Sequence, residues 1–316
     1  MRRFWLWPSE LRRSGILGIN RRNGEYVLPL NPRPYYPRVD EKHQTKLLCH
    51  RCRIPVPETY AMIRRHGDVP KFLELIGRRE EFVIKPGAGS GGRGILVVAR
   101  HDGAEFFTAG GERFTLADVT YHLGAVLSGL YSLAGQPDCA IIEQRLLPHP
   151  IFADVAVEGT PDVRVVLYRS VPVMAMVRLP TKASRGRANL HQGAAGAGIH
   201  LVTGRTFGGV CNDRAIAAHP DTRRSIAGLE IPGWNDLLSA AMELADAVEL
   251  GYVGVDFVLD AQRGPVVLEA NARPGLNIQV ANRRGLLPRL RFLDAQPPGR
   301  LRPDERRALI AELAEM

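Results

Sequence analysis

The sequence predicts a mixed α/β (α+β) fold, which two stretches and one pattern indicate. Residues 82–98 are apolar at both ends and glycine-rich between, which is typical of a hairpin. Residues 252–271 indicate a second hairpin, whose apolar strands carry acidic residues. Elsewhere, segments with helical apolar spacing alternate with short runs of Val, Ile and Leu. Helices and strands are therefore both expected.

The composition is that of an ordinary globular protein. The chain has 316 residues, of which 45% are apolar and 24% charged, enough for one large or two modest domains. No apolar run approaches the ~20 residues that a membrane helix needs, so membrane insertion is not expected. Four cysteines in no disulfide-type pattern favour structural roles and a reducing, cytoplasmic setting.

The net charge of +9 lies entirely in the first part of the chain. Residues 1–65 hold fourteen basic and five acidic side chains, whereas the rest of the chain is balanced. Such an excess could face nucleic acid, anionic lipid or an acidic substrate, or it could be an ordinary solvated surface. Because the region carries no recognised nucleic-acid motif, a nucleic-acid-binding module ranks last among the alternative functions.

The first 80 residues are expected to hold little regular structure before a group of helices. Residues 1–39 are predicted to be irregular apart from a short strand at 26–28, because four prolines follow. Residues 40–52 are predicted to form a helix with Asp40 as its N-cap. Two further helices are expected, at residues 59–66 and 69–78.

The glycine-rich hairpin indicates a polyphosphate site. Its five glycines let main-chain N–H groups approach an anion, while Lys85 and Arg93 add positive charge. A literal G-x-G-x-x-G spans residues 87–92, but a strand rather than a helix follows it, so a dinucleotide fold is not indicated. A plain glycine-rich surface turn is the alternative.

The middle and end of the chain alternate between the two kinds of element. A helix is predicted to begin at Thr115 with Asp118 as its capping-box partner, and another to run from Asn235 or Asp236 to Leu250. Residues 181–198 are predicted to form a mobile loop at a ligand. The remaining expected elements are strands at 140–142, 162–169, 171–179, 252–259 and 265–271, and a terminal helix from residue 303.

The last hairpin indicates a metal site. Glu269 and Asn271 are two residues apart and share one face of their strand. The short turn brings Asp256 opposite residue 268 or 269. Two carboxylates and an amide inside apolar surroundings suit Mg²⁺, and Arg273 adds a cation beside them.

With these motifs together, the chain resembles the ATP-grasp superfamily of carboxylate–amine ligases. It is most similar to the α-L-glutamate ligase-like branch related to ribosomal-protein S6 modification enzymes. The resemblance covers roughly residues 40–290 and implies two α+β subdomains that clamp ATP. It divides the chain into a shortened basic pre-grasp segment (1–39), a first subdomain with the glycine-rich lid (40–142), a second with the metal site (143–290) and a C-terminal tail (291–316).

The resemblance also implies residue roles. Lys46 and Lys85 look like the nucleotide lysines, and Asp162 faces the ribose. Glu143 looks like the adenine-edge acid. The complete nucleotide set is Lys46, Lys85, Gly89, Ser90, Gly91, Gly92, Glu143, Arg145, Leu146 and Asp162. The implied catalytic set is Arg164, Arg178, Asn189 and Arg273, and the metal set is Asp256, Glu269 and Asn271.

The implied activity is ATP-dependent formation of an amide or peptide bond through an acylphosphate, with ATP and Mg²⁺, or Mn²⁺ in its place. Glutamate or another acidic amino acid is a candidate substrate, and acceptors include small molecules and peptides. The basic segment at residues 20–23 is a candidate contributor to substrate binding. A phosphotransferase and a non-catalytic nucleotide-binding regulator stay open as alternative functions. Assembly of the chain into a homo-oligomer also stays open.

Overall fold

The computed structural model describes residues 10, 13–89, 91–132, 135–297 and 301–316. The chain divides into two compact units. The smaller unit consists of residues 41–46 and 56–147, and the larger unit of residues 1–40, 47–55 and 148–316. Helix α5 (Lys42–Arg51) begins in the smaller unit and ends in the larger one. No helix among the described residues has the length and apolar character needed to cross a membrane.

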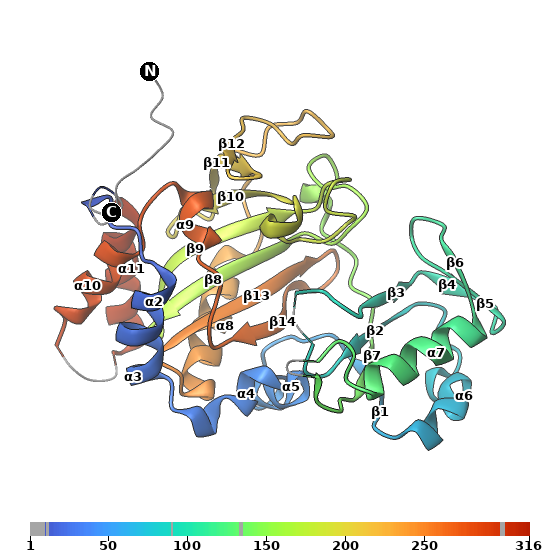
Figure 1. The fold of residues 1–316 in the computed structure, drawn as a ribbon. Helices are drawn as coiled ribbons and strands as arrows, with labels where there is room; N and C mark the ends of the chain where they lie inside the picture. The colour runs from blue at the N-terminus through green and yellow to red at the C-terminus, as the bar shows by residue number, and fades with distance from the viewer. Residues whose placement is uncertain (1–9, 11–12, 90, 133–134, 298–300) are drawn as a thin grey trace. The chain divides into compact units, whose positions relative to one another are not determined.

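The smaller unit is built on an antiparallel sheet of four strands in the order β1-β7-β2-β3 (Figure 1). Helix α7 (Leu116–Leu127) packs on this sheet through an apolar face, and its N-terminus has the expected Thr115–Asp118 capping box. The strands are β1 (Thr59–Ile63), β2 (Phe82–Pro86), β3 (Leu96–Val98) and β7 (Ala140–Glu143). A second, three-stranded sheet consists of β4 (Arg100–His101), β5 (Glu105–Phe107) and β6 (Arg113–Thr115).

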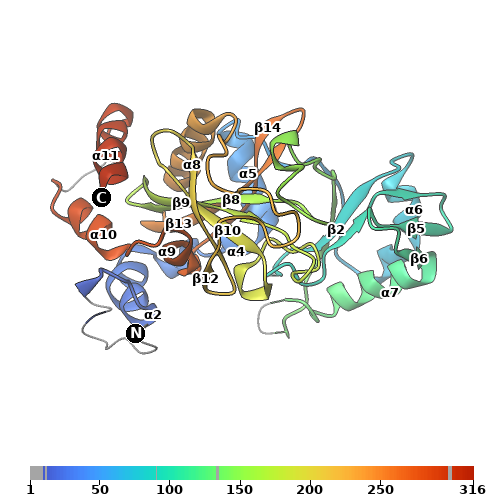
Figure 2. The same cartoon turned by 90° about the horizontal axis from the view of Figure 1, so that it is seen from above.

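The larger unit contains a seven-stranded antiparallel sheet in the order β12-β11-β10-β9-β8-β13-β14. Helices α8 (Trp234–Val248) and α9 (Asn277–Asn282) pack against its strands and lie on opposite sides of them in Figure 2. The strands are β8 (Asp162–Tyr168), β9 (Val171–Leu179), β10 (Ala195–Ile199), β11 (Thr206–Cys211), β12 (Arg214–Ala215), β13 (Tyr252–Asp260) and β14 (Gly264–Asn271). Two helices follow, α10 (Leu287–Asp294) and α11 (Pro303–Glu315).

The N-terminal segment is helical, so the prediction of irregular chain with a short strand at 26–28 is wrong. It forms α2 (Ile19–Arg21), a π-helix over Arg22–Val27, α3 (Leu28–Leu30), a 3₁₀ turn at Arg33–Tyr35 and α4 (Pro37–Asp40). Pro34 and Pro37 are tolerated because they occupy the first turns of their short helices, where no helical N–H is needed. Pro29 lies in the last turn of the continuous helical run over residues 19–30.

Four other element predictions need correction. The residues expected to form a helix at 59–66 instead form strand β1, which pairs with β7. Asp40 is the last residue of α4, and Glu41 lies between it and the first residue of α5. Helix α8 begins at Trp234, after Gly233 in a left-handed conformation. Residues 195–198 belong to strand β10 and not to a loop, because small Gly and Ala side chains fit between β9 and β11.

Candidate active site

The smaller unit holds two lysines that share one glutamate. Lys46 comes from α5, Lys85 from β2, and Glu143 is the last residue of β7. Lys46 Nζ and Lys85 Nζ each lie 2.5 Å from a different carboxylate oxygen of Glu143, and all three side chains are less than a tenth exposed. One carboxylate against two ammonium groups leaves one positive charge in a buried place, which favours an anion.

The two lysines differ in their other contacts. Lys46 Nζ also donates to Pro57 O at 2.9 Å and to Thr59 Oγ1 at 2.7 Å, so its three hydrogens have three acceptors. Among the residues that the structure describes, Lys85 Nζ has no recorded acceptor besides Glu143. Lys85 is therefore the lysine with hydrogens left for a ligand.

The glycine-rich loop is held at its ends and open at its tip. Ala88 N–H donates to Asp138 at 3.0 Å, and Lys42 Nζ donates to Gly89 O at 2.6 Å. Gly91 and Gly92 have positive φ, and a Cβ at either position would meet no atom within 4 Å. This leaves their backbone open to a ligand. Ser90, predicted to bind nucleotide, lies outside the described residues.

The segment after β7 contains the two other predicted nucleotide residues. Arg145 forms an ion pair with Glu81 at 2.8 Å, and Leu146 is 7% exposed. No hydrogen bond to the main-chain groups of Arg145 or Leu146 is recorded within the described part of the chain. Those main-chain groups thus have no recorded protein partner within the described residues.

In the larger unit, two aspartates and two arginines form a buried network across β8, β9 and β13. The register places Asp162 opposite Arg178 and Asp256 opposite Arg164. Arg178 Nε and Nη2 each donate to Asp162 at 2.5 Å, and Nη2 also donates to Asp256 at 2.9 Å. Arg164 Nε and Nη2 donate to the two oxygens of Asp256 at 2.6 and 2.5 Å.

The network shifts the pKa values of the two aspartates in opposite directions. Burial raises the pKa of Asp162 to about 6, aided by the negative charge of Asp256 and opposed by Arg178. Burial also acts to raise the pKa of Asp256, but the guanidinium groups of Arg164 and Arg178 outweigh it and hold that pKa below its usual range. Both acids are therefore mostly ionised at neutral pH, and Asp162 is the first to take up a proton as the pH falls.

The predicted metal residues lie together at the β13–β14 hairpin. Asp256 is opposite Glu269, which confirms the predicted register, and Asn271 Nδ2 donates to Glu269 Oε1 at 3.2 Å. No group of three or more His, Cys, Asp or Glu side chains that could hold a metal is found among the described residues. The donor set nevertheless fits Mg²⁺, because Glu269 and Asn271 retain oxygens that accept no recorded hydrogen bond, although Asp256 shares its own with arginines.

The two remaining catalytic candidates differ in exposure and contacts. Arg273 is exposed, and its guanidinium lies 5.1 Å from the Tyr36 ring centroid. Asn189 accepts a hydrogen bond from His191 N at 3.0 Å and so caps a short 3₁₀ turn. Asn189 thus has a structural role in its loop whatever else it contacts.

Sequence reasoning missed two buried side chains from the N-terminal segment. Asn31 Nδ2 donates to Tyr252 O and Ala272 O at 2.7 and 3.0 Å, and its Oδ1 accepts from Tyr252 N at 2.9 Å. Arg22, a candidate for substrate binding, is 7% exposed and donates to Pro274 O at 2.8 Å. These contacts fix the chain that leads out of β14. The contacts of Asn31 with Tyr252 and Ala272, and of Arg22 with Pro274, have no sequence signal, because these partners are more than 200 positions away.

Comparison with known proteins gives a family and a fold. The model of the sugar-transfer associated ATP-grasp family matches residues 21–295. No match is found among curated proteins. A pyruvate carboxylase structure from Rhizobium etli with acetyl coenzyme A is 17% identical, with 86% of this chain and 19% of that chain covered and a TM-score of 0.50.

Two other similar structures are described as a ligase and a synthetase. The ATP-grasp ligase PsnB with a minimal precursor is 18% identical with a TM-score of 0.46, and the match covers 84% of this chain and 62% of PsnB. D-alanyl-alanine synthetase A from Vibrio cholerae is 14% identical with a TM-score of 0.43, and the match covers 89% of this chain and 66% of that chain. This chain thus spans about three fifths of the length of PsnB.

Proposed function

This chain belongs to the sugar-transfer associated ATP-grasp family and has the ATP-grasp fold, and we propose that it is a ligase that uses ATP to join a carboxylate to an amine. The observation that carries the proposal is the buried Lys46–Glu143–Lys85 cluster at the base of the glycine-rich loop. A buried excess of positive charge beside open glycine N–H groups suits a triphosphate.

The smaller unit would bind the nucleotide. Lys85 would donate its remaining hydrogens to phosphate oxygens, and Lys46 would hold Glu143 in place through its saturated contacts. Gly91 and Gly92 would place main-chain N–H groups on the phosphates. The open main-chain groups at Arg145 and Leu146 would receive the adenine edge, with Glu143 beside them.

The larger unit would supply the metal ligands and the charges around the reacting groups. Glu269, Asn271 and Asp256 would hold Mg²⁺, which when bound neutralises phosphate charge. Arg164 and Arg178 would place fixed positive charge where an acyl oxygen becomes negative. Arg273, exposed at the end of β14, would reach phosphate or substrate.

The chemistry needs no nucleophilic side chain. The substrate carboxylate attacks the γ-phosphorus of ATP, so that an acylphosphate forms and ADP leaves. The amine then attacks the acyl carbon, phosphate leaves, and the amine loses a proton. The residues named above bind, orient and neutralise charge. An acidic amino acid such as glutamate suits the arginine-rich site and the basic N-terminal region.

The test is a screen for ADP release. Purified protein with ATP and Mg²⁺ is given amino acids, dipeptides and pairs of each, and products are identified by mass spectrometry. We expect ADP release that depends on both an acid and an amine, with a product lighter than the two substrates by one water. A phosphorylated product without an amide would instead identify a phosphotransferase, and the absence of turnover across the panel would favour a nucleotide-binding regulator.

A further inference from the structure

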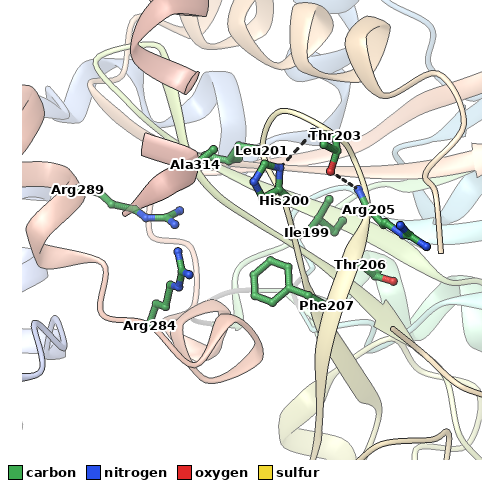
Figure 3. Close-up of a pocket in the computed structure, with 10 residues that line it drawn as sticks. All are labelled: Ile199, His200, Leu201, Thr203, Arg205, Thr206, Phe207, Arg284, Arg289 and Ala314. Atoms are coloured by element: carbon green, nitrogen blue, oxygen red, sulfur yellow. Dashed lines mark hydrogen bonds between the residues drawn. The ribbon is translucent and has the colours of Figure 1, made fainter. Parts of the chain in front are cut away.

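A pocket in the larger unit lies beside none of the residues assigned above. Figure 3 shows it between the ends of β10 and β11 and the helices near the C-terminus. Its volume is about 410 Å³, which is within the range of small-molecule sites. Two arginines, Arg284 and Arg289, form one part of its lining, and apolar side chains form another.

Arg289 is a buried cation with an unused donor. It lies in α10, is 3% exposed, and donates one hydrogen bond from Nη1 to Val173 O at 2.6 Å. Its Nε is buried and has no hydrogen-bond partner. A buried N–H of a charged group that lacks an acceptor is costly, so its position favours a ligand that supplies one.

Arg284 adds a second positive charge beside the first. In Figure 3 the two guanidinium groups point toward one another. Burial, and then the charge of Arg284, lower the pKa of Arg289 to about 10. Neither arginine takes part in any ion pair recorded among the described residues. Two cations that face each other without a carboxylate between them are the expected setting for an oxyanion.

The opposite wall of the pocket is apolar and fixed in place. The Phe207 ring packs on Gly198, where an added Cβ would approach a ring atom to 2.6 Å. Ile199 and Leu201 are buried beside it. A bare inorganic ion would leave this wall uncovered, whereas a molecule with a ring or hydrocarbon body would cover it.

We propose that this pocket binds a small organic anion, with its phosphate or carboxylate group on Arg284 and Arg289 and its body against Phe207. The site is separate from the Asp162–Arg178 network, because Val173, which bonds Arg289, precedes Arg178 by five residues along β9, roughly 16 Å of extended strand. The proposal is thus independent of the ligase function.

Calorimetric titrations test the site with phenyl phosphate and with benzoate, at constant ionic strength. We expect at least one to bind, and the tighter of the two identifies the anionic group. Arg284→Gln should weaken that probe about tenfold, because it removes a charge-assisted hydrogen bond. Arg291→Gln, which changes an exposed arginine on α10, the helix that carries Arg289, is the control and should leave binding unchanged.

Further variants keep the test decisive. Phe207→Ala should weaken the ring-bearing probe while leaving the weaker binding of inorganic phosphate as it was. Lys85→Met should change the affinity for neither the ring-bearing probe nor inorganic phosphate. No binding by either probe, equal binding in wild type and Arg284→Gln, or loss of binding in Lys85→Met would overturn the proposal; the last result would place the anion in the smaller unit.

Discussion

Glu143 bonds two lysines that differ in the number of other acceptors they reach. Lys46 has three acceptors, whereas Lys85 has only Glu143 among the described residues. Both are buried, so the sequence and the degree of burial alone would rate them equal. Their different contacts predict different consequences of substitution.

We expect Lys85→Met to weaken nucleotide binding by about 10- to 100-fold, because it removes charge-assisted bonds to phosphate, each worth roughly 1.5–3 kcal/mol. Lys46→Met should instead lower stability, because it leaves Glu143 and Thr59 without their shared donor. Calorimetry with Mg·ADP and thermal unfolding separate the two effects. Lys71→Met, which removes a lysine side chain that is 63% exposed, is the matched control. Equal affinity in Lys85→Met and the control would contradict the assignment.

The two acids of the β13–β14 hairpin should also respond differently. Glu269→Gln should lower ADP formation by at least about a hundredfold and leave stability near that of wild type, because Glu269 forms no recorded ion pair in the described chain. Asp256→Asn should also cost roughly 3 kcal/mol of unfolding free energy, because it weakens the charge pairing of Arg164 and Arg178. Urea unfolding and a coupled ADP assay measure both, with exposed Asp213→Asn as control. Normal turnover in Glu269→Gln would remove the metal assignment.

The contacts of these side chains could be predicted from the sequence to different degrees. The pairing of Asp256 with Glu269 was predictable because a short hairpin turn sets the register. The contact of Lys46 with Glu143 joins residues 97 positions apart and needed the docking of α5 on the sheet. The engagement of Asp256 by two arginines was not predictable, because it depends on strand order in the sheet.

At the scale of elements, the predictable strands are those with long apolar runs. Strands β8, β9, β13 and β14 contain such runs, and their predicted bounds differ from the observed ones by a residue or so. Strand β1 was mistaken for a helix, because its five residues carry no clear alternation and pairing with β7 decides their conformation. Strand β10 is Ala-Gly-Ala-Gly-Ile, which has little strand propensity of its own and is set by its two neighbours.

The N-terminal segment is hydrogen-bonded through Asn31 to the main chain at the end of the large sheet. Asn31 makes three hydrogen bonds to the main chain at Tyr252 and Ala272 and is 2% exposed. Asn31→Ala should therefore lower the unfolding free energy by roughly 2–4 kcal/mol, since buried main-chain groups lose their partners. Urea unfolding measures the change, and exposed Asn20→Ala should have almost no effect. Equal stability of the two variants would show that the hydrogen bonds of Asn31 contribute nothing to the free energy of unfolding.

Helix α7 anchors the far end of the glycine-rich loop through His122. The Nε2 atom of His122 lies 3.0 Å from Gly94 O. Burial lowers the pKa of His122, with the Gly94 hydrogen bond opposing. The unfolded state therefore binds more protons below about pH 6.5, and the stability due to neutral His122 is lost as the pH falls through that value.

His122→Gln keeps a donor for Gly94 but does not titrate. We compare the melting temperature of wild type with that of this variant at each pH. Relative to the variant, the melting temperature of wild type should fall by a degree or two as the pH falls from 7.5 to 5.5. Thermal unfolding at a series of pH values measures it. A difference that is independent of pH would mean that His122 does not titrate differently in the folded and unfolded states.

At the scale of the whole molecule, α5 links the stability of the two units through the chain itself. One end of this continuous helix belongs to the smaller unit and carries Lys46, and the other end belongs to the larger unit and carries buried Cys49. Neither unit can lose its part of the helix without fraying the part that belongs to the other.

We therefore expect a single cooperative thermal transition, although the chain has two compact units. Mg·ADP at about 100 times its dissociation constant should stabilise the folded state by about 2.7 kcal/mol and raise that one transition by roughly 3–5 °C. Calorimetry measures the number of transitions and their shift, and Lys85→Met should show the same transition without the shift. Two transitions, of which nucleotide moves one, would show that the units unfold separately and that α5 does not couple them.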